Sequence, residues 1–512
     1  MLAALDNAPC VAAIAQLQPP STVARGLVLF ELAAQDGGMA ALCFSRFLGQ
    51  MPIAEFGTEE QKARYASGKN LLHGALCLTE PIPGAGAEAL LLMGTYRPAG
   101  GVESPLIEID KRGRFTSQME FAEFVVAAVQ GVDGARGSAL VLLEPGDAGS
   151  FDRGTPVRKV GQRIASTTHP AFRLRIPASR IVGGFTIEDG VLRPRFDHRQ
   201  LLEPALRRAR TLLALTTAAK ALAVTRESLP HRADIGAAFW LACADLWAAG
   251  EAAASLGFLS ARLCDAHEER GAGNSLDAAE INLFTSAAKL FASTRIAPGL
   301  ARVAAEAGAG ADNFLRHAAD AQVEAVSMGP EATQRRALSA AFGEASFDAK
   351  SAGWIDEMES CATGFCAPAA RNLAAGFRLW WRTLCVLRDA AGADSIFHGA
   401  HQAAAFALAD ALSGLLAARS LLLDAAELDA AAREREAGIV VDLVRLAAAS
   451  AVSRATQSCT GLSYGLRDSS LVARSHRELA ALRAEACASL SGFQYARERI
   501  ARFLESGEDA AE

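Results

Sequence analysis

Hydrophobic positions recur with the 3.6-residue period of an α-helix over residues 23–70 and again from about 198 to 512. Between about 73 and 185 the pattern changes to short runs in which apolar and polar residues alternate. These runs read HGALCLT, FAEFVVAAVQ, SALVLLEP and AFRLRIP, and clusters of Gly, Pro and Asp separate them. The pattern predicts helices, then a β domain, then helices again.

The stretch GTEEQKARYASGKNLLHGALCLTEP, residues 57–81, predicts how the first helices lead into the sheet. Thr58 and Gln61 have the spacing of a capping box, and two glutamates follow Thr58 in the first turn, where the helix dipole favours carboxylates. Residues 75–79 then alternate between the two faces of a strand, which Pro81 ends. We therefore expect a short helix that leads directly into the first strand.

A second border is predicted near residues 339–360, where the apolar period lapses and Gly, Ser, Asp and Lys gather. Together the two borders divide the chain into four parts. We expect a truncated N-terminal helical domain over 1–72, a middle β domain over 73–190, a helical bundle over 191–345 and a C-terminal helical extension over 346–512.

The composition is that of a chain that can bury a large core. It has 512 residues, of which 51% are hydrophobic and 21% are charged. The formal net charge of -6 leaves no general excess of basic residues for nucleic-acid phosphates, so we expect no nucleic-acid partner. The ten cysteines include no Cys-x-x-Cys pair, which favours free thiols in a reducing compartment, and the histidines lack metal-ligand spacing, so we expect no metal site.

The sequence also indicates neither a secretion signal nor a transmembrane segment. Its N-terminus carries Asp6 and has no basic region ahead of an apolar stretch. The most apolar run, residues 401–432, is interrupted by Asp410, Arg419 and Asp424, which favours a packed helix over a membrane span. We therefore expect a cytoplasmic protein.

Four motifs occur in one order along the chain: GTEEQK, LTEP, GRFTSQMEFAEFVVAA and KVGQRIASTTHPAFRLRIPASRIVGG. In this order and near this spacing they resemble the acyl-CoA dehydrogenase family, over roughly residues 25 to 345. The resemblance implies an α+β, mostly α fold with N-terminal helices, a middle β domain and a C-terminal four-helix bundle. The helices after the bundle are similar to the additional helical domain of very-long-chain acyl-CoA dehydrogenases and acyl-CoA oxidases.

The resemblance also implies an FAD cofactor, which needs hydrogen bonds to its polar edge and a flat apolar slot. The positions that match the family's cofactor contacts are Leu78, Thr79, Gly86, Thr116, Ser117, Arg232 and Gly308. Arg232 matches the arginine that reaches the FAD pyrophosphate of a neighbouring subunit, and a guanidinium suits that task because it binds two phosphate oxygens at once. The resemblance therefore implies a homodimer or a higher homo- or hetero-oligomer that binds an acyl-CoA.

The family's catalytic base is where this chain departs most. Dehydrogenation of an acyl thioester removes a proton from the α-carbon while a hydride leaves the β-carbon, so a carboxylate must face the α-carbon. In register with Gly329 and Gln334, the position of this glutamate falls on Met328, whose thioether accepts no proton. Register from Arg232 puts Leu206 at the second position that some relatives use.

Three other carboxylates remain candidates for the base. Glu331 lies three residues after Met328, so on a helix it would face nearly the same way. Glu203 lies one turn ahead of Arg207. The C-terminal block carries a faint echo of the family's closing helices, which would put Glu485 in the base position of a second copy.

Three functions are consistent with these residues. The first is an FAD-dependent oxidoreductase that acts on acyl-CoA thioesters with an unusual base. The second is a catalytically inactive subunit with the acyl-CoA dehydrogenase fold that pairs with an active partner. The third is a flavin-dependent monooxygenase on the same fold, whose chemistry requires no α-proton abstraction.

Overall fold

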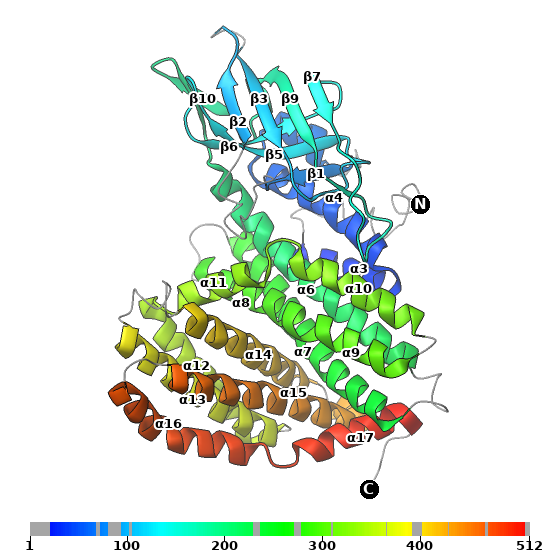
Figure 1. Ribbon diagram of the computed structural model, residues 1–512, viewed down its shortest axis with the longest axis vertical. Helices are drawn as coiled ribbons and strands as arrows, with labels where there is room; N and C mark the ends of the chain where they lie inside the picture. Colours follow the sequence, from blue (N-terminus) through cyan, green and yellow to red (C-terminus); the bar gives the residue numbers. More distant parts are fainter. Residues whose placement is uncertain are drawn as a thin grey trace. The chain divides into compact units, whose positions relative to one another are not determined.

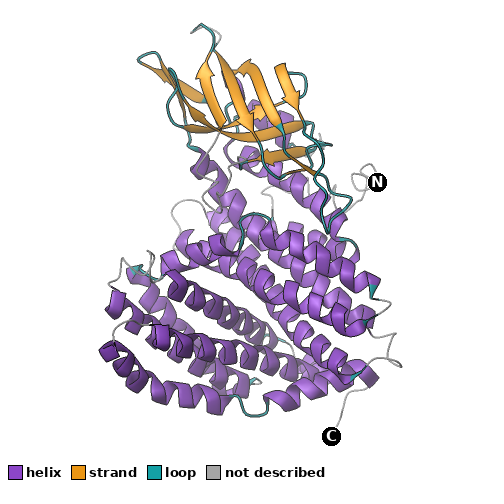
Figure 2. Ribbon diagram, in the orientation of Figure 1, coloured by secondary structure: helices purple, strands orange, loops and turns teal. Residues whose placement is uncertain are grey.

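The computed structural model describes residues 21–67, 72–79, 94–101, 105–228, 236–270, 278–308, 311–364, 366–391, 402–428, 430–465 and 469–506. The chain divides into two compact units, Met1–Leu212 and Leu213–Glu512. The first unit contains the strands and the second is helical, as the colouring by secondary structure shows (Figure 2).

The first unit begins with helices α3 (Thr22–Gln35) and α4 (Gly37–Phe56), followed by the short α5 (Glu59–Gln61) and the π-helix η1 (Lys62–Ala66). The Asp36 carboxylate accepts hydrogen bonds from two backbone N–H groups in the first turn of α4. The predicted capping box is confirmed, because the Thr58 hydroxyl accepts from the backbone N–H of Gln61 and the Gln61 side chain accepts from that of Thr58.

Seven strands form the main sheet of the first unit, in the order β1-β5-β2-β3-β9-β7, with β6 paired to β5 (Figure 1). The pairs β4-β8 and β10-β11 form two small sheets. The strands are β1 (Gly74–Cys77), β2 (Gly94–Pro98), β3 (Leu106–Arg112), β4 (Thr116–Ser117), β5 (Phe124–Gly131), β6 (Ser138–Leu143), β7 (Ala148–Asp152), β8 (Thr167–Thr168), β9 (Ala171–Pro177), β10 (Phe185–Glu188) and β11 (Val191–Pro194).

Strand β5 has hydrophobic core on both of its faces. Val125, Ala127 and Val129 pack into one apolar cluster of the sheet. Phe124 and Val126 point the other way, into a second cluster that includes residues of α4, η1 and the first turns of helix α6 (His198–Ser228). Burial on both sides explains why this strand is a continuous apolar run.

The helices of the second unit are long and pack side by side. They are α6 (His198–Ser228, which begins in the first unit), α7 (Ala237–Arg270), α8 (Ala278–Phe291), the π-helix η6 (Ala292–Ile296), α9 (Ala297–Ala307), α10 (Asp312–Val326), α11 (Glu331–Ala341), α12 (Ala345–Ser360), α13 (Ala367–Ala391), α14 (Gln402–Ala426), α15 (Ala430–Gly465), α16 (Ser469–Ser489) and α17 (Phe493–Ser506).

Helix α14 contains the most apolar run of the chain. By length and composition it could cross a membrane, but 72% of its most apolar window is buried inside the structure. It contacts α7, α8, α11, α13 and α15, as a packed core helix does.

The segment 339–360, where the apolar period lapses, contains helix α12, and the domain border predicted there stays a prediction. Phe347, Ser351, Trp354 and Met358 are buried at spacings of four, three and four residues, and many of the residues between them are exposed. One buried serine and the many exposed polar residues hide the helical period in the sequence.

Candidate functional site

The end of strand β1 lies against the turn that leads into β4. The Thr79 hydroxyl donates a hydrogen bond to the carbonyl of Arg114 over 2.6 Å, and the Arg114 backbone N–H donates to the Thr79 carbonyl over 2.9 Å. The buried Lys111 ammonium donates to the Leu78 carbonyl over 3.1 Å. The structure therefore brings Leu78 and Thr79 next to the turn that carries Thr116 and Ser117, as the motifs predict.

Strained backbone surrounds β4 on both sides. Phe115 has φ 51° and Gln118 has φ 64°, in the left-handed region that non-glycine residues adopt at a cost. Between them Thr116 pairs with Thr168 of β8 and Ser117 with Thr167. Phe115 is 54% exposed, and its ring lies 4.9 Å from the ring of His169 and 4.9 Å from the Arg114 guanidinium, so a partly exposed aromatic ring stands beside Thr116.

Four buried polar atoms gather on this turn and its partner strand without a hydrogen-bond partner among the described residues. They are Thr116 Oγ1, both amide atoms of Gln118, and Ser166 Oγ. The Gln118 side chain is only 3% exposed, and its backbone N–H donates to the Ser166 carbonyl over 2.8 Å. Buried polar groups in native proteins are almost always satisfied, so this cluster fits a ligand or water that offers both donors and acceptors.

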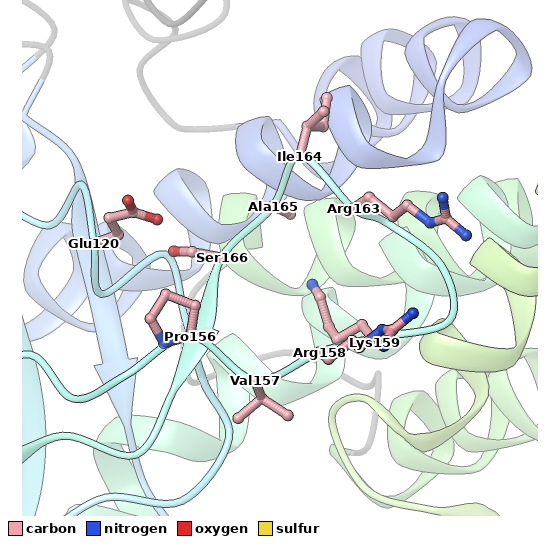
Figure 3. Close-up of a pocket in the computed structure, with 9 residues that line it drawn as sticks. All are labelled: Glu120, Pro156, Val157, Arg158, Lys159, Arg163, Ile164, Ala165 and Ser166. Atoms are coloured by element: carbon pink, nitrogen blue, oxygen red, sulfur yellow. The ribbon is translucent and has the colours of Figure 1, made fainter.

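A cavity of about 350 Å³ opens next to Ser166 (Figure 3). The loop that carries Arg158, Lys159 and Arg163 curves around it, and Glu120 lies on its other side. Three cationic side chains against one carboxylate make the lining net positive, which favours a ligand with phosphate or carboxylate groups.

The cavity loop is anchored at both ends. Arg153 donates to the carbonyls of Met119 and Ala122, over 2.5 Å and 2.9 Å. At the far end Ile164 packs so closely on Gly38, in the first turn of α4, that any side chain there would collide with it. The cations therefore project from a supported loop rather than from a free one.

Met328 lies in the second unit, in the connection between α10 and α11. It has φ 55° and the following Gly329 has φ 96°. The buried Gln334 side chain donates to the carbonyls of both residues, over 3.3 Å and 3.1 Å. Glu331, the candidate base nearest to it in sequence, forms an ion pair with Arg335 at 2.9 Å, and Arg335 also binds Asp410.

The remaining candidate carboxylates are also paired. Glu485 lies on α16 and forms an ion pair with Arg378 of α13. Glu203 lies 3.6 Å from Arg207 on α6, and the neighbouring Leu206 packs against an apolar core cluster. The roles of Glu331 and Glu485 as bases stay predictions.

Two of the predicted cofactor positions, Gly86 and Arg232, lie outside the described residues. Gly308 ends α9 with φ 65°, and a side chain there would meet nothing within 4 Å. Among the described residues, no group of three His, Cys, Asp or Glu side chains could hold a metal ion.

Sequence reasoning missed Gln118, Ser166 and the three cations of the cavity loop. Ser166 stands in a quoted motif, but the signal that marks it, an unsatisfied hydroxyl beside Gln118, arises only when β4 pairs with β8. The cations lie in one short stretch, but nothing in the stretch says that it encloses a cavity.

The model of the acyl-CoA dehydrogenase N-terminal domain matches residues 18–68. Among solved structures, an acyl-CoA dehydrogenase complexed with FAD from Bacillus anthracis has a TM-score of 0.76 at 19% identity, over 95% of this chain and 85% of that chain. This chain has the acyl-CoA dehydrogenase fold. The resemblance inferred from the motifs and the predicted fold are both confirmed, and a match over 95% of the chain includes most of the C-terminal helices.

Shorter relatives match less of the chain. Butyryl-CoA dehydrogenase from Megasphaera elsdenii has a TM-score of 0.52 at 20% identity, over 62% of this chain and 81% of its own. A glutaryl-CoA dehydrogenase from Mycobacterium smegmatis in complex with FADH2 has a TM-score of 0.50 at 19% identity, over 62% of this chain and 78% of its own. No curated protein sequence matches significantly.

Proposed function

We propose that this chain is an FAD-binding oxidoreductase that acts on acyl-CoA thioesters. One observation carries the proposal: the Leu78–Thr79 strand end meets the β4 turn, and buried polar atoms of Thr116 and Gln118 have no partner there among the described residues. The acyl-CoA dehydrogenase fold of the chain supports it.

The residues of this turn fit the needs of a flavin. The Thr116 hydroxyl and the Gln118 amide can donate to and accept from the polar edge of the ring, and the exposed Phe115 ring offers a flat apolar contact. When bound, FAD would supply the capacity to accept a hydride. The protein would supply hydrogen bonds, orientation and exclusion of water.

The cavity beside Ser166 fits the phosphate-bearing part of a CoA thioester. Arg158, Lys159 and Arg163 can pair with phosphate oxygens, and their supported loop keeps the cost of ordering them low. We therefore propose that CoA phosphates bind along this loop.

A second candidate function is favoured by the ion pairs that the candidate base carboxylates form. Met328 stands at the family's base position, and both Glu331 and Glu485 are held in ion pairs with arginines. A positioned base contributes roughly 10²–10⁴-fold to proton abstraction. A flavoprotein without one suits chemistry that leaves the α-proton in place, as in a monooxygenase, or a non-catalytic subunit that pairs with an active partner.

The first experiment reconstitutes the full chain with FAD and adds butyryl-CoA or palmitoyl-CoA without oxygen. Bleaching of the flavin absorbance supports the dehydrogenase, and a Glu331→Gln variant then tests that carboxylate as the base. Stable yellow colour without bleaching, together with bleaching by reduced nicotinamide, supports the monooxygenase. A protein that retains no FAD absorbance after gel filtration from saturating FAD contradicts both and leaves the non-catalytic subunit.

A Met328→Glu variant separates an empty base position from a lost binding site. If only the base is missing, the glutamate should raise the rate of bleaching by acyl-CoA by roughly the 10²–10⁴-fold that a positioned base contributes. Met328→Gln is the matched control, because it has nearly the same shape and accepts no proton at neutral pH. Equal rates in the two variants would contradict the assignment of position 328.

We further propose that the chain forms an oligomer, as the resemblance at Arg232 implies. Mass photometry of the full-length protein, with and without FAD, measures this directly. A monomer in both conditions would contradict it.

A further inference from the structure

Three charged side chains lie buried in the second unit. Lys220 on α6 is 0% exposed, Lys289 on α8 is 1% exposed and Glu324 on α10 is 1% exposed. Buried charges are costly unless they are paired and hydrogen-bonded. The partners of these three side chains therefore show which segments the cluster holds together.

The Glu324 carboxylate is clamped from α6. Lys220 Nζ lies 2.6 Å from Glu324 Oε1, and the Thr217 hydroxyl donates to Glu324 Oε2 over 2.8 Å. Both carboxylate oxygens are therefore bound, and the last turns of α10 are tied to α6.

Lys289 binds the end of the same helix through the backbone. Its ammonium donates to the Glu324 carbonyl over 2.6 Å, to the Ala325 carbonyl over 3.3 Å and to the Ser293 hydroxyl over 3.0 Å. An ammonium has three N–H groups, and here three acceptors take them. A positive charge at the C-terminus of α10 also interacts favourably with the negative end of the helix dipole.

The connection Ser327–Pro330 begins directly after this braced helix end. Its two left-handed residues, Met328 and Gly329, are bound from the other side by the buried Gln334 of α11. Side chains of α6 and α8 thus hold the end of α10, and a side chain of α11 holds the connection that follows it. A non-glycine residue keeps a left-handed conformation only when its surroundings enforce it.

We propose that Lys289, through the C-terminus of α10 that Lys220 and Glu324 also hold, is a positioning residue for Met328. The catalytic meaning of this role rests on the proposed function, since it is there that position 328 faces the substrate. The restraint itself can be measured without ligand.

The protonation of Lys289 makes this restraint depend on pH. Burial lowers the pKa of Lys289 to about 8, against the opposing charges of Glu324 and Glu331; the Lys220 ammonium binds the same Glu324 carboxylate. A neutral amine has only two N–H groups for the three acceptors, so as the proton leaves either a bond to the end of α10 is lost or the Ser293 hydroxyl turns to donate to the nitrogen lone pair.

The test follows Met328 by NMR in the full-length protein labelled with [methyl-¹³C]methionine. The chain has seven methionines, and a Met328→Leu variant assigns the signal. We expect the Met328 methyl shift to titrate with a midpoint near pH 8. The Lys289→Arg variant keeps its charge at all these pH values, so there the titration should disappear.

If an arginine does not fit at position 289, a Ser293→Ala variant provides a second test. It removes one of the three acceptors, so a neutral Lys289 can still serve both carbonyls and the pH response of Met328 should shrink at least twofold. A Met328 signal that titrates equally in wild type, Lys289→Arg and Ser293→Ala would overturn the inference, as would a wild-type signal without titration between about pH 7 and 9.

A separate readout keeps this inference distinct from the proposed function. If the protein binds FAD and Met328→Glu raises its rate of bleaching by butyryl-CoA, then adding Lys289→Met to Met328→Glu should lower that rate at least tenfold with an unchanged Kd for FAD. If it binds no FAD, the proposed function fails while the NMR result still stands.

Discussion

Gln61 is the residue whose replacement tests the first unit most sharply. Its side-chain N–H groups donate to the carbonyls of Ser179 and Ile181, each over 2.8 Å. Its oxygen accepts from the backbone N–H of Thr58 over 3.0 Å and of Gly183 over 3.1 Å. The side chain is 5% exposed, so one buried amide joins a helix N-terminus to the segment that follows β9.

A Gln61→Leu variant has similar volume and removes all four bonds. Two of the groups that it strands, the Ile181 carbonyl and the Gly183 N–H, are fully buried and cannot turn to water. Each buried group without a partner costs about 1–3 kcal/mol. We expect a loss of about 2–5 kcal/mol, a large share of the 5–15 kcal/mol that holds a typical domain together.

The assay is hydrogen exchange in urea, read by mass spectrometry on peptides from β5 and β6. All five tryptophans lie beyond residue 212, so tryptophan fluorescence follows the second unit as an internal control. The matched variant is Gln200→Leu, because Gln200 accepts from Asp197 in a similar cap at the start of α6 but is exposed. We expect it to cost less than about 1 kcal/mol.

The two variants together decide the matter. If Gln61→Leu lowers the free energy of opening of β5 and β6 by no more than Gln200→Leu does, then the buried amide is not what joins these segments. A Gln61→Glu variant adds a second check. Its carboxylate faces the two carbonyls and should recover stability as the pH falls and the side chain becomes a donor again.

Three further predictions concern titration. Burial alone would raise the pKa of Glu144, but a tyrosine and two arginines that contact it lower the pKa below 4.5. The stability that the ionised Glu144 contributes is therefore lost as the pH falls, and Glu144→Gln should make the free energy of unfolding depend less on pH in the acid range, as measured by circular dichroism. Burial raises the pKa of the Cys243 and Cys459 thiols to about 12, so iodoacetamide at about pH 8 should label Cys487 and spare these two, and equal labelling by mass spectrometry would contradict this. The pKa of Lys289, about 8 when folded and 10.5 when unfolded, makes stability rise with pH between these values, and Lys289→Met should remove that rise in urea unfolding followed by tryptophan fluorescence.

Much of the fold could be predicted because local patterns and burial agree. The runs that became β1, β5, β6 and β9 are apolar enough to stand out, and the cap at Thr58 needs only two residues at a fixed spacing. Strands β2 and β3 were missed because they are short, or carry charged residues on their exposed face, and their pairing comes from distant parts of the chain.

The candidate site was predictable only in part, for a physical reason. Thr79 and Thr116 stand in motifs, and the structure brings their segments into hydrogen-bonding contact. Gln118 is a candidate site residue because its buried amide has no hydrogen-bond partner among the described residues, and this burial arises only when the neighbouring strand packs against it. The positioning role that we propose for Lys289 likewise depends on a contact between helices, because Lys289 lies on α8 and donates to the Glu324 carbonyl of α10.

The most direct test of the flavin site is the Kd for FAD in wild type, Gln118→Leu and Thr116→Val, with a Thr95→Val variant at an exposed position of β2 as the control. Each hydrogen bond contributes about 1 kcal/mol, so the loss of two at Gln118 should raise the Kd about thirtyfold and the loss of one at Thr116 about fivefold. The Thr95 control should leave it unchanged. Binding that is equally tight in all four proteins, or no binding of FAD to the wild type, would contradict the account.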